Sequence, residues 1–352
     1  MWPYWMLYSI PALLVFFVLG SGRRLQLSPS FWMVLGGFFV FFIGFRYQVG
    51  GDWGSYLRHY DSAVGKSWIE AIVLGKDPGY AFVNWLMAKW GLQIYGVNLV
   101  CGALFITGLI IFCRQQPDPL LAFVVAVPYL VVVVAMGYSR QGVALGLLFW
   151  AITYLDRGKF LHYLVLIAIG ALFHKTLLIM VPFGVFLSGA GGVFRVGGIL
   201  LAGYGLWDAL FAQDQQRLVT QYVDLQMISE GAKVRVLMNV VPSLLLLIYW
   251  KRWKQFFPNH LFWLSMAVVS IIAFGVVDLA STAVDRITLY FAPIQLAVYS
   301  RLAHLPLLPR RQMDPGMVSV TIVLAYAAVL YVWLNYAGHA YAWVPYQNIL
   351  FL

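Results

Sequence analysis

Long apolar runs decide what this chain can fold into. The segment from Phe31 to Phe45 (FWMVLGGFFVFFIGF) carries no charge, and similar runs of about 15–20 residues recur along the sequence. Hydrophobic residues make up 62% of the chain and charged residues 10%, which leaves too little polar surface for an exterior in contact with water. Barrel strands would instead alternate over about 10 residues. The sequence therefore predicts an all-α, polytopic integral membrane protein.

The apolar runs define about 12 candidate transmembrane helices. The segment 175–188 is short and contains Pro182, so we expect it to be tilted, broken or re-entrant. Residues 79–91 are apolar on one face but too short to cross a bilayer, and they predict an amphipathic helix lying at the membrane interface. The candidate spans are 4–20, 31–45, 95–113, 118–137, 140–155, 159–173, 175–188, 193–211, 236–250, 260–278, 286–302 and 316–335.

Basic residues set the orientation of the predicted helices. They collect in short loops on one side, which the positive-inside bias makes cytoplasmic. Both termini then lie outside, together with two long extracytoplasmic segments, 46–94 and 212–235, that we expect to line a site. No change in composition marks a second domain, so residues 1–352 form a single polytopic membrane domain. The basic residues of the cytoplasmic loops also account for the net charge of +10, which therefore does not indicate a nucleic-acid partner.

Polar side chains gather at the outer ends of the apolar runs. Taken alone, each basic residue fits simple anchoring in lipid head groups, and aromatic residues such as Trp343 fit an interfacial belt. As a set, however, the basic residues oppose the positive-inside bias, and several have polar neighbours that anchoring does not need. A binding site for a charged ligand does need them. The set comprises Arg46, Asp52, Asp77, Tyr80, Ser139, Arg140, Gln141, His174, Lys175, Lys233, Arg235, Asp278, Asp285, Arg286 and Tyr346.

The residue types in this set indicate a lipid-borne phosphate as the ligand. A guanidinium group can donate two parallel hydrogen bonds to two oxygens of one phosphate. A phosphate carried by a lipid would lie at the height of the lipid head groups. Asp52, in a Gly-Gly-Asp-Trp-Gly turn, is the first candidate general base and His174 the second. A His174 bonded only to backbone, and an Asp285 that caps a helix beside Arg286, remain open alternatives. No acidic pair is spaced for a metal ion, so we expect neither metal nor cofactor. The candidate phosphate ligands are Arg46, Arg140, Arg235 and Arg286.

Short motifs follow one another along the chain in a recognisable order. They resemble the motifs of the EpsG family, whose members are Wzy-like polymerases of bacterial exopolysaccharide and O-antigen. The resemblance covers nearly the whole chain, with Asp77 standing where the family more often has glutamate. The motifs are Arg46-Tyr47-Gln48-Val49-Gly50-Gly51-Asp52 with Tyr56, Asp77-Pro78-Gly79-Tyr80, Ser139-Arg140-Gln141, Phe173-His174-Lys175-Thr176, Asp285-Arg286 with Tyr290, and Val344-Pro345-Tyr346.

The resemblance implies a metal-independent glycosyltransferase of the bacterial inner membrane whose site faces the periplasm. Its substrates would be undecaprenyl-diphosphate-linked oligosaccharide and polysaccharide, surrounded by membrane lipids. A chain-length regulator and a flippase of the same pathway would be its protein partners. For this chemistry, the candidates to bind the diphosphate are Arg46, Arg140, Arg235 and Arg286, and the candidate general bases for the acceptor hydroxyl are Asp52 first and His174 second. Substrate binding would fall to Tyr56, Asp77, Tyr80, Gln141, Lys175, Asp285, Tyr290 and Tyr346.

Three other functions remain open from the sequence. An O-antigen-ligase-like transferase would use a similar donor with a different acceptor. A flippase or transporter of lipid-linked glycan would need polar residues along a path through the membrane, whereas the polar residues here lie at one edge. A structural partner in a synthase complex would leave the chemistry to another chain, which the ordered motifs do not favour.

Overall fold

The chain is helical throughout the part that the structure describes. The computed structural model describes residues 1–21, 27–75, 77–187, 197, 231–256, 259–279, 281–302, 304–305 and 314–352. Within these ranges the one extended pairing is an isolated bridge between Arg46 and Asn348. The predicted all-α membrane protein is therefore confirmed. The predicted span 193–211 and the loop before residue 231 fall outside the described residues, apart from residue 197.

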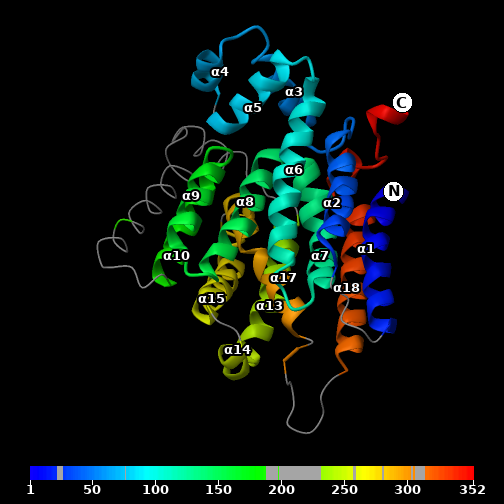
Figure 1. The fold of residues 1–352 in the computed structure, drawn as a ribbon, viewed down its shortest axis with the longest axis vertical. Helices are drawn as coiled ribbons and strands as arrows, with labels where there is room; N and C mark the ends of the chain where they lie inside the picture. Colours follow the sequence, from blue (N-terminus) through cyan, green and yellow to red (C-terminus); the bar gives the residue numbers. More distant parts are fainter. Residues whose placement is uncertain are drawn as a thin grey trace.

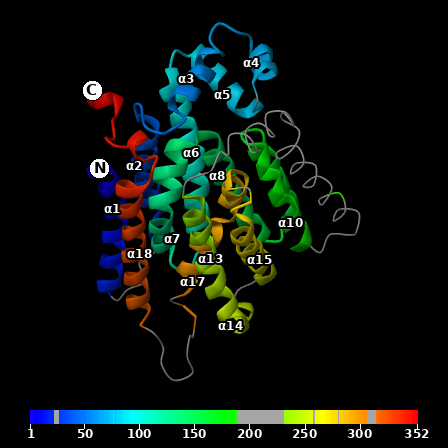
Figure 2. The same ribbon diagram turned by 180° about the vertical axis from the view of Figure 1, so that it is seen from behind.

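Most helices lie side by side and form a bundle (Figures 1 and 2). By length and composition, α1, α6 and α18 are long and apolar enough to cross a membrane, whereas α2, α9 and α15 are apolar but shorter. Twelve full-length spans are therefore not established among the described residues. The bundle comprises α1 (Trp2–Ser21), α2 (Pro29–Gly44), α6 (Gln93–Cys113), α7 (Pro119–Ala126), α8 (Ser139–Leu155), α9 (Phe160–Ala171), α10 (Val181–Leu187), α13 (Ala232–Ile248), α14 (Trp250–Phe256), α15 (His260–Val276), α17 (Pro293–Leu302) and α18 (Pro315–Tyr336).

Three predicted spans change helix type along their length. Residues 118–137 begin as α7 and continue as a π-helix, η1 (Val127–Ala135). Residues 175–188 begin as a 3-10 helix, η2 (Lys175–Met180), before α10, so the break that we expected there is present. Residues 286–302 comprise the end of α16 (Ser281–Thr288), the 3-10 turn η5 (Leu289–Phe291) and α17. Each change lies beside a proline, which lacks the N–H that a continuous α-helix requires.

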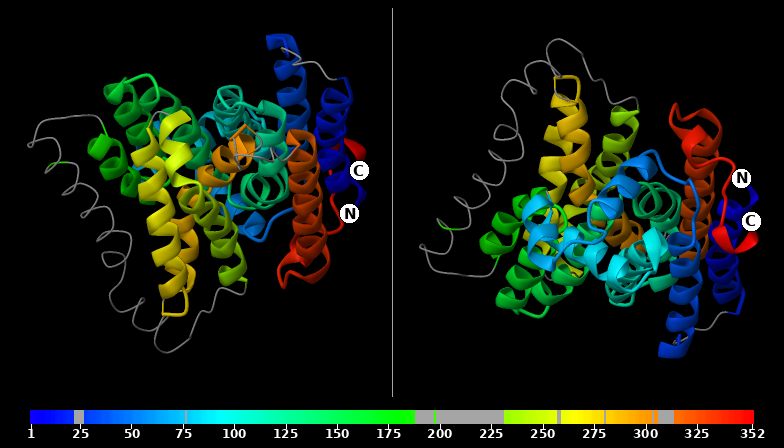
Figure 3. Two further views of the ribbon diagram at one scale, coloured as in Figure 1. Left: turned by 90° about the horizontal axis from the view of Figure 1, so that it is seen from below. Right: turned by 90° about the horizontal axis from the view of Figure 1, so that it is seen from above.

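Three short helices form a layer over one end of the bundle (Figures 1 and 3). They are α3 (Trp53–Asp61), α4 (Trp68–Leu74) and α5 (Pro78–Lys89), and we call this layer the cap. The predicted amphipathic helix at 79–91 is α5. Ser67 and Glu70 form a capping box at the start of α4, and the indole N–H of Trp85 donates to the carbonyl of Lys66 at 3.1 Å. The capping box fixes the start of α4, and the Trp85 bond joins α5 to the segment just before α4.

The C-terminal segment returns to the same end as the cap. It contains the 3-10 turns η6 (Ala340–Ala342) and η7 (Ile349–Phe351), and the two termini lie near each other (Figure 3). The hydroxyl of Tyr4 donates to the carbonyl of Trp343 at 2.6 Å. The backbone N–H of Tyr47 donates to Gln347 at 2.9 Å. The start of α1, the end of α2 and the C-terminal segment therefore form one unit.

Helices α6 and α8 approach each other closely at two glycines. A Cβ on Gly108 would lie 1.9 Å from the carbonyl oxygen of Gly146, and a Cβ on Gly146 would lie 2.5 Å from the Cα of Phe105. Small residues of this kind allow membrane helices to pack backbone to backbone. Gly142, one turn before Gly146, has its nearest such neighbour at 3.4 Å, the Cα of Ala135. Gly146 rather than Gly142 therefore sets the α6–α8 distance, and with it the position of α8.

Replacing Gly146 by alanine should force α6 and α8 apart. We expect the Gly146→Ala protein to lose about 1–3 kcal/mol of stability, because the new methyl group would clash with backbone atoms of α6, which cannot rotate away as a side chain can. Thermal unfolding of the purified protein in detergent measures this loss. Gly142→Ala is the matched control and should unfold at the wild-type temperature. Equal unfolding temperatures for all three proteins would contradict this account of the packing.

Candidate functional site

Segments far apart along the chain meet beneath the cap, at the N-terminal end of α8. Arg140, in the first turn of α8, forms a 2.6 Å ion pair with Asp77 at the start of α5. The guanidinium also lies over the ring of Tyr56 in α3, 5.9 Å from its centroid. The N–H of Gly79 donates to the carbonyl of Leu172 at 2.9 Å, which brings the segment before His174 to the same place. Four of the sequence motifs therefore share one site.

The backbone around Gly50 brings Asp52 to this site. Gly50 has φ of +108°, and a Cβ there would lie 2.7 Å from the carbonyl oxygen of Met136. Its N–H donates to the carbonyl of Ala342 at 2.8 Å. The segment before Asp52 is thus held between the start of α8 and the C-terminal segment. This fixes Asp52, the N-cap of α3, against the end of the bundle that carries Arg140.

Arg46 lies behind the site rather than at its surface. Only 1% of the residue is exposed. Its guanidinium donates to the carbonyl of Ile43 and, at 2.8 Å, to the hydroxyl of Ser139. Tyr346 lies nearby and donates to the carbonyl of Phe42 at 2.9 Å. These contacts let Arg46 support the residue that precedes Arg140, whereas a ligand at the surface would not touch it directly.

Asp52 and His174 differ in how well each suits the role of a base. Burial raises the pKa of Asp52, although the positive charges of Arg140 and Arg286 oppose this. Burial, Arg140, Arg286 and Lys175 together lower the pKa of His174 to about 3. The imidazole is therefore neutral at physiological pH and a weak proton acceptor, whereas the Asp52 carboxylate is more basic than an ordinary aspartate. The electrostatics favour Asp52.

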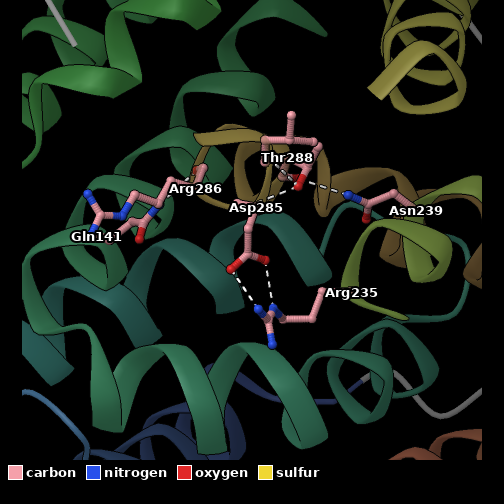
Figure 4. Close-up of polar contacts among 7 residues, drawn as sticks. Gln141, Arg235, Asn239, Asp285, Arg286 and Thr288 are labelled. Atoms are coloured by element: carbon pink, nitrogen blue, oxygen red, sulfur yellow. Dashed lines mark hydrogen bonds and ion pairs between the residues drawn. The ribbon is translucent and has the colours of Figure 1, made fainter. Parts of the chain in front are cut away.

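Helix α16 lies beside Arg140 and carries two further charged residues. Asp285 accepts both arms of the Arg235 guanidinium from α13, at 2.6 and 2.8 Å (Figure 4). Asp285 is therefore not the N-cap partner of Arg286, because α16 begins four residues earlier, at Ser281. Arg286 lies in the last turn of α16, not at a helix start. Its side chain is exposed and forms no ion pair with any described residue.

The remaining sequence-predicted residues hold the site together. The side-chain amide of Gln141 donates to the carbonyl of Arg286 at 2.9 Å, which joins α8 to α16. Tyr290 is fully buried, and its hydroxyl lies 3.1 Å from that of Thr176. Tyr80 is also buried and packs edge-on against Tyr56. Lys175 contributes positive charge near His174.

A sequence profile of the EpsG family matches residues 30–348. The chain belongs to the EpsG family. This family consists of Wzy-like polysaccharide polymerases, so its membership makes the protein a polysaccharide polymerase. The match includes Arg46, Arg140, Arg286 and the C-terminal segment as far as Asn348. No curated protein and no solved structure matches the chain.

Two residues that support this candidate site were not found by sequence reasoning. Asn239 interrupts the apolar run of α13 and donates to the carbonyl of Thr288 at 2.8 Å. A polar residue inside a membrane span is a signal that would have identified it. Trp343 fits an aromatic belt by its position, but it is fully buried and its indole N–H donates to the carbonyl of Val132 at 2.8 Å. No local pattern distinguishes such a tryptophan from an interfacial one.

Replacing Trp343 by phenylalanine should destabilise the segment that leads into α8. We expect a loss of about 1–3 kcal/mol, because the carbonyl of Val132 in the π-helix is left buried without its donor. Unfolding in detergent measures the change. Trp333 packs against Trp343 with ring centroids 5.0 Å apart, and no hydrogen bond of its indole is seen among the described residues. Trp333→Phe should therefore cost less, and the reverse order would refute the role of the indole N–H.

Proposed function

We propose that this polymerase transfers a growing glycan from undecaprenyl diphosphate to a hydroxyl of a second lipid-linked repeat unit. The reaction would take place on the periplasmic face of the bacterial inner membrane. The observation that carries the proposal is the grouping of Arg140 and Arg286 near Asp52 at one end of an apolar bundle, with Arg235 held by Asp285, the residue before Arg286. Three cations in one place suit a diphosphate at head-group height.

The bond changes assign a role to each charged group. The acceptor oxygen attacks the anomeric carbon of the donor sugar, and the bond from that carbon to the diphosphate breaks. The leaving diphosphate takes the electron pair, so cations already in place stabilise the transition state. The acceptor proton passes to Asp52, the more basic of the two candidates. Because the arginines neutralise the leaving group, we propose that the reaction needs no metal ion.

The three arginines are not equally available to the diphosphate. Arg286 is exposed and forms no ion pair with the described residues, so it is ready to bind an anion. Arg140 is paired with Asp77, and its side chain is 25% exposed. Arg235 is held by both oxygens of Asp285. Arg286 would therefore make the first contact with the diphosphate, and Arg140 would share its charge between Asp77 and the ligand.

Transfer to a different acceptor, as in an O-antigen ligase, would use the same diphosphate chemistry. A mixture of lipid-linked repeat units without any other acceptor separates the two functions. A polymerase forms products of many lengths from this mixture, whereas a ligase forms none. Transport is less favoured, because the buried polar residues in the middle of α13, Asn239 and Ser243, are hydrogen-bonded to neighbouring protein groups.

Removing the Arg286 guanidinium should stop polymerisation without disturbing the fold. We expect Arg286→Ala to lower the rate of product formation by about a hundredfold or more. Gel separation of products from purified protein and lipid-linked repeat units measures the rate.

The Arg140→Ala substitution should have a similar effect on the rate. It is made together with Asp77→Asn so that no buried carboxylate loses its partner. Lys233→Ala is the control, since Lys233 pairs with Asp278 in the open at 2.8 Å. Normal product lengths from both arginine variants would exclude the diphosphate role.

Replacing Asp52 by asparagine should abolish turnover and leave binding of the lipid diphosphate intact. In the wild-type protein, kcat should fall as the pH drops through the pKa of Asp52, because only the deprotonated carboxylate accepts the proton. Since burial raises this pKa, the fall begins at a higher pH than for an ordinary aspartate. His174→Gln should keep the same acid limb, because His174 is already neutral. An unchanged kcat in Asp52→Asn would move the base role to another group.

A further inference from the structure

Helix α16 ends in a way that leaves one backbone carbonyl without its usual donor. In a continuous α-helix, the N–H of Ala292 would donate to the carbonyl of Thr288. Here it donates to Leu289 at 3.1 Å instead, because the chain tightens into the 3-10 turn η5 before Pro293. Thr288 is buried, and the 3-10 turn gives its carbonyl oxygen one backbone donor, which leaves a second lone pair for another partner. The side-chain amide of Asn239 supplies this partner at 2.8 Å (Figure 4).

Asn239 belongs to a chain of hydrogen bonds that crosses the inside of the bundle. Its side-chain oxygen accepts from the amide of Gln295 in α17 at 2.7 Å. The oxygen of Gln295 in turn accepts from the hydroxyl of Tyr326 in α18, also at 2.7 Å. Asn239 and Gln295 are each 2% exposed. We call these three residues the amide chain, and it gives the amide of Asn239 a fixed orientation because both of its ends are engaged.

The amide chain lies directly beneath the charged groups of the site. Arg235 is one helical turn before Asn239 on α13, and Asp285 is about one turn before Thr288 on α16. The Arg235–Asp285 ion pair and the Asn239–Thr288 bond therefore join the same two helices at successive turns. On its other side, α16 is joined to α8 through Gln141 and the carbonyl of Arg286 (Figure 4). Two side-chain amides thus hold α16 between the helices that carry Arg235 and Arg140.

From this geometry we infer that Asn239 is a positioning residue, which sets α16 so that Arg286 and the Arg235–Asp285 pair face the diphosphate site. This inference rests on the proposed function for its ligand, but not for the positioning of α16 itself. Asn239 would touch no substrate, because it is buried and both ends of its amide are bonded to protein. Its effect on binding would arise from the orientation of α16.

Two measurements on the full-length protein test this role. The first is hydrogen exchange of the α16 backbone in the absence of ligand. The second is binding of farnesyl diphosphate, a short isoprenoid diphosphate, to protein in detergent. Asn239→Leu should speed exchange over residues 281–288. It should also weaken binding by about tenfold to a hundredfold, because a loosened α16 no longer holds Arg286 in place for the diphosphate. Ser243→Ala is the matched control, because it removes only a bond within α13, from its hydroxyl to the carbonyl of Asn239.

The outcomes separate this inference from the proposed function. If α16 of the Asn239→Leu protein exchanges hydrogen at the wild-type rate, the positioning role is overturned, whether or not the diphosphate binds. If the wild-type protein does not bind farnesyl diphosphate but α16 still exchanges faster in the variant, the diphosphate site fails and the positioning of α16 stands. Should Asn239→Leu not fold, Gln295→Met removes one of the two partners of Asn239 at similar volume, and it should also speed exchange in α16. Unchanged exchange in that variant would equally overturn the inference.

Discussion

The ion pair between Arg140 and Asp77 is the contact on which the arrangement of the site depends. A guanidinium at the end of an apolar helix must be solvated or paired, and here the carboxylate that pairs with it lies at the start of α5. This contact ties the cap to the bundle, because α8 belongs to one and α5 to the other. Tyr56 from α3 lies on the face of the same guanidinium. One charged group therefore gathers three helices around the place where the ligand would bind.

Arginine has a different function at the opposite end of the bundle. Arg301 looks like a simple membrane anchor in the sequence, yet it is buried between Trp253 and Trp263, whose ring centroids lie 5.9 and 5.7 Å from the guanidinium carbon. It also donates to Gln116 in the loop after α6. This arginine binds protein on all sides and joins α17 to α14, α15 and the α6–α7 loop. Arg286, in contrast, forms no ion pair with the described residues and is open to a ligand.

Much of the site was predictable because its motifs are short and local. Arg140, Asp77 and Asp52 stand out in an apolar chain, and their place at helix ends indicated a shared surface. The partners of these residues were not predictable. Asp285 lies next to Arg286 in the sequence, but it pairs with Arg235, because successive residues on a helix point in different directions. The role of Asn239 depended on a helix break at Pro293 that hydropathy does not reveal.

The sequence by itself determined that the chain is a helical membrane protein and that the polar residues of the site stand at the ends of apolar helices. Both follow from the transfer of side chains between water and lipid, which depends on residue type and spacing along the chain. Only the tertiary structure decided which arginine is buried behind the site, which ones are paired and which one is open. The pairing of a charge depends on groups within a few ångströms in space, and in this fold those groups come from helices dozens of residues apart.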